Sequence, residues 1–137
     1  MANEAVLVFD THVPIPMTCL NANAMEKGTC VKLEDAFTVS ASNGAEDYCG
    51  GITATEKIAS DGRTKVAVYR GGIFKVMSSG SITAGQVVTI HSVANTFVVS
   101  DATCVSSKTW GIALETVSNA ETFLMELRPA SNANAYS

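Results

Sequence analysis

The sequence predicts an all-β fold, a small β-barrel or sandwich built from two related β-meanders with an extended N-terminal arm. Its apolar segments are short, rich in Val, Ile, Thr and Phe, and bounded by Gly, Asn, Asp or Ser, which is typical of strands and turns. No segment carries a long 3.6-residue hydrophobic period, although Asn21 to Lys27 is compatible with one helical turn. In addition, the two halves of the chain contain similar phrases in the same order.

The N-terminal segment, residues 1–17, has two interpretations. Val6 to Phe9 is apolar and is followed by Pro14-Ile15-Pro16, in which two prolines favour an extended path and remove amide donors. In the first interpretation this segment is an arm ahead of the barrel. In the second, Val6 to Phe9 is the first strand of the core.

Residues 18–129 are predicted to form the barrel, and residues 130–137, rich in Ser, Asn and Ala, a polar tail. The expected strands are apolar runs between turn residues. They are Ala5 to Phe9, Thr29 to Leu33, Gly51 to Thr55, Lys65 to Val76, Val87 to His91, Thr96 to Ser100, Thr109 to Glu115 and Thr122 to Arg128.

Turn residues connect these runs. Asp61-Gly62 supplies a positive φ for a tight hairpin between the strand that begins at Gly51 and the strand that begins at Lys65. Ala94-Asn95 and Ser118-Asn119 are weaker turns of the same kind. Gly71-Gly72 interrupts the longest run, either as a bend that closes a barrel corner or as a loop between two strands.

An internal repeat underlies the prediction of two meanders. The phrase around Gly28 recurs around Gly85, Gly51-Ile52 recurs as Gly111-Ile112, and Thr64 to Arg70 recurs loosely as Thr122 to Arg128. The offsets are 57, 60 and 58 residues. Short strands rich in Val, Ile and Thr also resemble one another by chance, but the phrases occur in the same order in both halves of the chain, which favours two related β-meanders.

Composition limits the classes of partner. Only 16% of the 137 residues are charged, against about 25% in an average soluble domain, so apolar surface is expected to be covered by something besides the core. The net charge of -4 argues against nucleic acid. No signal peptide or membrane-spanning run is expected, so synthesis in a cytoplasm is predicted.

No catalytic constellation is recognisable, and we predict no enzyme activity, cofactor, metal or small-molecule substrate. The chain has no P-loop and no nucleophile elbow. His12 and His91 lie far apart in the sequence, and the four cysteines show no zinc-like spacing. We interpret Cys19, Cys30, Cys49 and Cys104 as reduced, buried thiols. Trp110 is expected to be a core residue, with an interface anchor as the alternative.

Four phrases carry a resemblance to a known family. They are Gly50 to Ala54, Val66 to Phe74, Ser81 to Val88 and Trp110 to Glu115. Their ordered set resembles the small capsid decoration, or head cement, proteins of tailed phages, over roughly Thr29 to Arg128. Some members of that family are labelled as recombinases, a label that this chain does not support because it lacks a nucleotide-binding loop.

The resemblance implies a virion protein on the outer surface of the capsid that stabilises the lattice of the major capsid protein. We expect it to bind that protein and itself, as a homotrimer. The expected contact residues lie in the arm and at the Gly71 corner: Leu7, Phe9, Val13, Ile15, Arg70 and Phe74. A carbohydrate- or receptor-binding β module of a virion surface is the alternative, although only nine Phe, Trp and Tyr residues are present.

Overall fold

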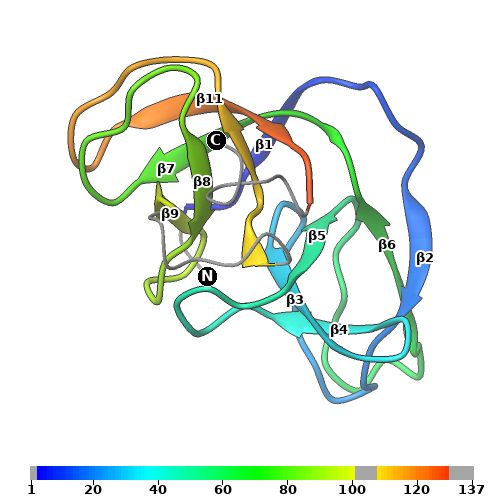
Figure 1. Cartoon of the computed structure of the whole chain (residues 1–137). Helices are drawn as coiled ribbons and strands as arrows, with labels where there is room; N and C mark the ends of the chain where they lie inside the picture. Colours follow the sequence, from blue (N-terminus) through cyan, green and yellow to red (C-terminus); the bar gives the residue numbers. More distant parts are fainter. Residues whose placement is uncertain (1–2, 101–107, 130–137) are drawn as a thin grey trace.

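The computed structural model describes residues 3–100 and 108–129, and these residues form eleven β-strands and no α-helix. The strands are β1 (Val6–Phe9), β2 (Ile15–Thr18), β3 (Cys30–Asp35), β4 (Thr38–Ala41), β5 (Cys49–Thr53), β6 (Lys65–Tyr69), β7 (Gly72–Ser78), β8 (Val87–Ile90), β9 (Thr96–Val99), β10 (Gly111–Ala113) and β11 (Thr122–Leu127) (Figure 1). The all-β prediction is confirmed.

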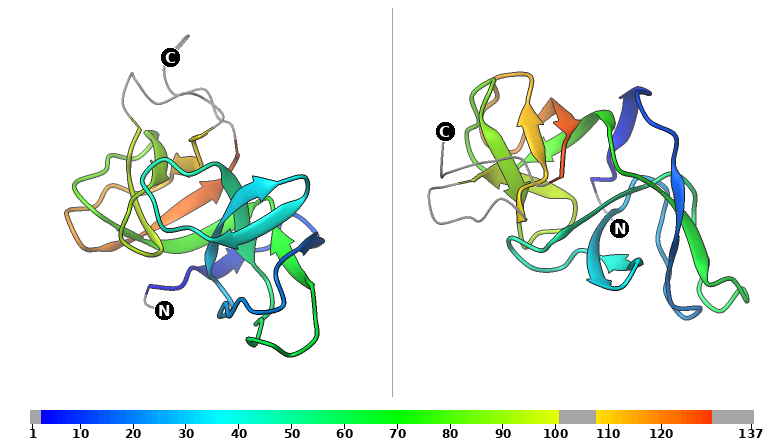
Figure 2. Two further views of the ribbon diagram at one scale, coloured as in Figure 1. Left: turned by 90° about the horizontal axis from the view of Figure 1, so that it is seen from below. Right: turned by 45° about the vertical axis from the view of Figure 1, so that its right-hand side comes forward.

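The strands form two small barrels (Figures 1 and 2). The first closes in the order β2-β4-β3-β5-β6. In the second, β7, β11, β10, β8 and β9 follow one another, and the parallel pairing of β7 with β9 closes the ring. Each predicted meander therefore closes a barrel of its own, where we had expected the two meanders to share one.

The repeat extends to the pairing scheme. In the first barrel β2 pairs with β4 in parallel, and β2–β6, β3–β4, β3–β5 and β5–β6 are antiparallel. In the second barrel β7–β9 is parallel, and β7–β11, β8–β9, β8–β10 and β10–β11 are antiparallel. Each strand of one barrel thus has a counterpart five positions later in the order of strands. β1 stands outside this scheme.

Two glycines explain why the Gly-Ile phrase recurs. A Cβ on Gly51 would lie 2.2 Å from the carbonyl oxygen of Tyr69, and a Cβ on Gly111 would lie 2.2 Å from that of Glu126. These distances are far below van der Waals contact, so only glycine allows the neighbouring strand to approach so closely. The repeated sequence and the repeated geometry therefore have the same steric cause.

Several predicted elements differ from the structure. β2 and β4 lay in segments that we had not predicted as strands. The run from Lys65 to Val76 divides at Gly71 into β6 and β7, which belong to different barrels, so the loop interpretation of the glycines is the correct one. Residues 21–27 contain a turn and the bridge of Met25 with Lys57 instead of a helical turn.

The N-terminal segment and the predicted turns can also be compared with the structure. β1 pairs with β7 of the second barrel and β2 is part of the first barrel, so Val6 to Phe9 forms a strand, but a largely exposed one at the edge of the sheet and not a core strand. β5 and β6 pair as predicted, but residues 54–64 join them as a long loop and not as a tight hairpin. Asn95 has the expected positive φ of 58°. The predicted tail lies outside the described residues.

Two hydrophobic clusters fill the molecule. One lies within the first barrel and includes Met17, Val31 and Val68. The other fills the second barrel and extends into the first through Cys30, Cys49 and Ile52 of β3 and β5, and it contains the fully buried Trp110, as predicted. The second cluster therefore also forms the seam between the barrels.

Polar contacts cross the same seam. The backbone N–H of Cys30 donates to Asn95 Oδ1 at 2.9 Å, and both groups are buried. The indole Nε1 of Trp110 donates to the carbonyl oxygen of Asp47 at 3.0 Å, and the N–H of Glu46 donates to the carbonyl oxygen of Ile90 at 3.1 Å. These bonds fix the orientation of one barrel relative to the other.

Candidate docking face around the first strand

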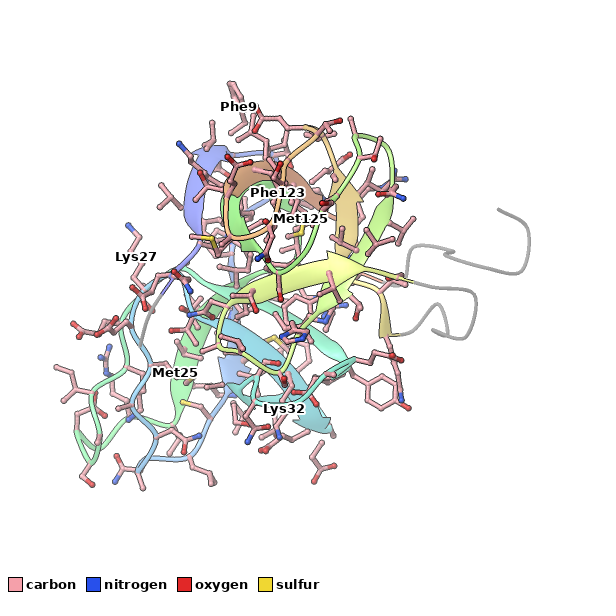
Figure 3. The ribbon with its side chains drawn as sticks, turned by 90° about the vertical axis from the view of Figure 1, so that its left-hand side faces the viewer. Phe9, Met25, Lys27, Lys32, Phe123 and Met125 are labelled. Atoms are coloured by element: carbon pink, nitrogen blue, oxygen red, sulfur yellow. The ribbon has the colours of Figure 1, made fainter. Side chains whose placement is uncertain are left out.

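β1 is an edge strand with an apolar surface. One edge pairs with β7, through Val6 opposite Lys75 and Leu7 opposite Phe74, and the other edge has no partner among the described strands. Val6, Val8 and Phe9 are exposed, and so is Val13 in the connection to β2. We call these four residues the N-terminal face. Figure 3 shows the Phe9 side chain projecting from the surface.

This face is the densest group of its kind in the described part of the chain. Four of the eleven large hydrophobic side chains that are exposed there fall within residues 6–13. Phe9 is 58% exposed and Val13 is 83% exposed. Unpaired edges and contiguous apolar patches are common features of surfaces that bind another protein.

Four of the six predicted contact residues come from the N-terminal segment, and the structure separates them. Phe9 and Val13 are exposed, as a contact residue requires. Leu7 and Ile15 are half-buried, and they pack against the second and the first hydrophobic cluster respectively. Leu7 and Ile15 therefore hold this segment on the barrels.

The predicted contact at the Gly71 corner needs correction. Phe74 is 1% exposed and belongs to the second cluster, where its ring makes an edge contact with Tyr69 at 5.6 Å. Arg70 donates from Nη1 to the carbonyl oxygens of Cys49 at 2.7 Å and Gly50 at 3.1 Å. Phe74 is therefore removed from the predicted contact surface, whereas Arg70 is half-buried and its contact role stays a prediction.

Sequence reasoning missed Val6, Val8 and Glu4. Val6 and Val8 were included in the apolar run but were not separated from the inward-facing Leu7, although the period of two in a strand would have distinguished them. Glu4 has a buried oxygen, Oε2, with no hydrogen-bond partner in the structure. No local sequence signal identifies such an atom, because its burial depends on distant segments.

The thiols are buried, as predicted for those described. Cys19, Cys30 and Cys49 are free and buried, and Cys104 lies outside the described residues. Burial raises the pKa of Cys30 well above its usual range and raises the pKa of Cys49 to about 12. Both thiols are therefore protonated at neutral pH and react slowly.

The other candidate groups do not gather into a reactive site. His12 Nδ1 lies 2.8 Å from the hydroxyl of Thr11, and His91 Nδ1 accepts the N–H of Val93 at 3.3 Å. Within residues 3–100 and 108–129, no group of three His, Cys, Asp or Glu side chains is placed to hold a metal. The same residues include no helix with the length and hydropathy needed to cross a membrane.

The fold and this face define a class of protein: a tandem pair of five-stranded barrels with an apolar strand added to the edge of the second. No family model matches the chain, and no curated protein matches it. Among solved structures, the chain is similar to the N base of the head fiber gp8.5 of bacteriophage phi29. That similarity covers 90% of this chain and 98% of the other, with a TM-score of 0.57 and 13% identity, and it establishes a shared fold.

Proposed function

We propose that this protein is a structural component of a phage head, which attaches to the outer surface of the capsid and stabilises the lattice of the major capsid protein. The observation that carries the proposal is the shared fold: the base of a phage head fiber has this architecture over 98% of its length. The resemblance of the four sequence phrases to capsid decoration proteins supports the same location.

The N-terminal face supplies the physical means of attachment. Removing apolar surface from water is worth about 25 cal/mol per Å², and Val6, Val8, Phe9 and Val13 present such surface on one segment. If the protein binds as a homotrimer, three such faces act together, and each attached subunit raises the effective concentration of the others. A modest contact then yields durable attachment without any chemical step.

Mixing the purified chain with undecorated phage heads and imaging the mixture by cryo-electron microscopy tests this proposal. We expect density on the outer capsid surface with the wild type and at least tenfold weaker binding with Phe9→Ser/Val13→Ser, roughly the loss of one well-buried apolar side chain. Phe37→Ser/Val93→Ser is the matched control, because Phe37 is 53% and Val93 is 54% exposed elsewhere on the molecule.

Two results would contradict the proposal. Absence of wild-type density on heads at any protein concentration would remove the capsid role, and binding to a glycan array in that case would favour the virion-surface carbohydrate-binding alternative. Equal loss of binding in the test and control variants would show that the N-terminal face is not the contact. Size-exclusion chromatography of the free protein tests the trimer.

A further inference from the structure

The outer face of the sheet formed by β7, β11 and β10 has an apolar composition. β7 and β11 lie side by side (Figure 1), and alternate side chains of each strand point away from the second cluster. We call the outward residues the sheet face. They are Ile73, Lys75 and Met77 of β7, Thr122, Leu124 and Glu126 of β11, and Ile112 of β10. Large apolar residues predominate among them, where a solvated face of an antiparallel sheet normally carries polar ones.

Four of these residues form a rectangle at the centre of the sheet face. Lys75 is opposite Leu124 in the pairing of β7 with β11, and Ile73 is opposite Glu126. The two charges therefore lie on one diagonal of the rectangle and the two apolar side chains on the other. In the part of the chain that the structure describes, neither Lys75 nor Glu126 takes part in an ion pair.

The surroundings of Glu126 favour a cation from outside. Its carboxylate is half-buried, and it lies between Ile73 on one neighbouring strand and Ile112 on the other. A charged group beside apolar side chains is poorly solvated, so an opposite charge that approaches the face is attracted to it. Lys75 is exposed on the same face and offers the complementary charge.

We propose that the sheet face binds the same face of a second copy of this chain, about a two-fold axis that runs along the diagonal from Ile73 to Leu124. Rotation about this axis exchanges the ends of the other diagonal, so Lys75 of each copy meets the partner's Glu126. The apolar residues on the axis meet their own counterparts. A two-fold interface has to be self-complementary, and this charge complementarity assigns the face to a second copy. The strands of the two copies cross steeply, as in orthogonal packing of two sheets.

This inference goes beyond the proposed attachment to a capsid. Val6 of the N-terminal face is opposite Lys75 in the pairing of β1 with β7, so the two faces adjoin and a dimer carries two N-terminal faces on one particle. The two-fold contact gives a dimer in place of the homotrimer that the resemblance implies, and the mass of the free protein distinguishes them. Dimer formation needs no phage head, so its test is independent of the capsid role.

Sedimentation velocity of the full chain across a concentration series is the first test. We expect a reversible dimer. Lys75→Glu brings carboxylates together at both ends of the contact and should weaken the dimer about tenfold or more. Lys75→Glu/Glu126→Lys restores opposite charges and should return the dimer to within about threefold of the wild type. Lys65→Glu, the same change at the exposed start of β6 in the first barrel, is the matched control and should leave the dimer unchanged.

Cysteine cross-linking tests the position of the axis. Ile73 lies on it, so Ile73→Cys places two thiols opposite each other. With copper phenanthroline as the oxidant, we expect a disulfide-linked dimer from Ile73→Cys on a non-reducing gel. Val93→Cys is the control, because Val93 is 54% exposed outside the sheet face, and it should give no more than the wild type, which reports the background from the native cysteines.

Several results would overturn the dimer. They are a wild type that stays monomeric at every concentration, a trimer as the sole oligomer, and a double charge variant as weak as Lys75→Glu. Equal cross-linking of Ile73→Cys and Val93→Cys would refute the axis. A monomeric wild type that attaches to heads would leave the proposed function standing, whereas a dimer that ignores heads would refute the proposed function alone. Far-UV circular dichroism checks that each variant is folded.

Discussion

Lys57 brings an ammonium group into the first barrel, where it is 1% exposed. It donates to the carbonyl oxygens of Asn21 at 2.8 Å and Ile58 at 2.7 Å, and it lies 2.9 Å from Asp61 Oδ1. The bridge of Lys57 with Met25 has its counterpart in the bridge of Val117 with Ile82, so the second barrel uses valine at this place. Where the second barrel has an apolar side chain, the ammonium of Lys57 thus connects the loop that contains Asn21 to the loop that contains Ile58.

Substituting Lys57→Met tests this role. The carbonyl oxygens of Asn21 and Ile58 would lose their donor and Asp61 its cation, which we expect to lower the free energy of unfolding by roughly 3 kcal/mol. Chemical denaturation measures this. Val117→Met, which introduces the same side chain at the corresponding place of the second barrel, is the control for altered packing. A Lys57→Met variant as stable as the wild type would show that the carbonyls find water without cost.

Asp61 predicts a pH dependence. The hydrogen bond from Lys57, followed by the backbone N–H of Arg63, holds the pKa of this carboxyl well below its usual range. A lowered folded-state pKa contributes stability above the unfolded pKa, about 4, and that stability is lost as the pH falls toward the folded-state value. We therefore expect the Tm of the wild type to fall more steeply below pH 4 than that of Asp61→Asn. Parallel curves would contradict this.

At the scale of the elements, β7 and β2 occupy equivalent places in the two barrels, but β7 is paired along both edges and β2 is paired fully along only one. β7 pairs with β11 along one edge, and β9 and β1 share the other. β2 pairs with β6 along one edge, but it meets β4 only at Thr18 opposite Thr38. The upstream part of that edge therefore has no strand partner within the described residues, and it contains Pro14 and Pro16.

The two prolines fall on that open edge. Amides alternate between the edges of a strand: Cys19 donates toward β6, to the carbonyl oxygen of Thr64, whereas Thr18 donates toward β4, to that of Phe37. Positions 14 and 16 share the side of Thr18, so the prolines remove the donors that another strand would use.

We expect Pro14→Thr/Pro16→Thr to associate with increasing concentration, because two amide donors return to an unpaired edge. Light scattering across a concentration series measures the effect. The wild type and Val13→Thr, which introduces threonine nearby without restoring an amide donor, serve for comparison. A double variant whose scattering matches that of Val13→Thr would mean that the prolines do not protect the edge.

Gly28 and Gly85 form a matched pair that tests how the N-terminal segment is anchored. Both have a positive φ, 89° and 94°, but a Cβ on Gly28 would collide with Ala5 whereas nothing lies within 4 Å of one on Gly85. We expect Gly85→Ala to cost about 1 kcal/mol from backbone strain and Gly28→Ala roughly 2 kcal/mol more from the collision. Equal losses in urea unfolding would contradict the close contact.

At the scale of the whole molecule, the shared cluster and the seam hydrogen bonds join the two barrels into one unit. Cys30 and Ile52 come from the first barrel, yet they pack with Phe97 and Trp110 of the second. A barrel that separated would expose this apolar surface and leave the Cys30 N–H without its bond to Asn95. Separation is therefore costly.

We expect unfolding in a single transition, with the fluorescence of Trp110, in the second barrel, coinciding with far-UV circular dichroism of both. Asn95→Gly, which tolerates the φ of 58°, should lower the free energy of unfolding by roughly 2 kcal/mol and keep the two curves coincident. Two separated transitions in the wild type would show that the barrels fold independently.

Local sequence patterns were sufficient to predict the fold class, the repeat and the burial of several residues. The all-β class, the repeat, the burial of Trp110 and the buried thiols followed from strand-like runs, Gly positions and residue chemistry, which act over a few residues. The apolar run at Val6 to Phe9 was also visible as a contact candidate. These features needed no knowledge of which strands pair.

Long-range pairing determined the rest. β2 contains Pro16, which on local grounds argues against a strand, and it forms because β6 supplies a full antiparallel partner. Phe74 and Phe9 are both apolar residues of strands, but β7 lies within a barrel and β1 at its edge, so one is buried and the other exposed. The diagonal of Lys75 and Glu126 likewise arises only from the register between β7 and β11. Burial and edge position are properties of the assembled sheets, because strands distant in sequence must meet before either exists.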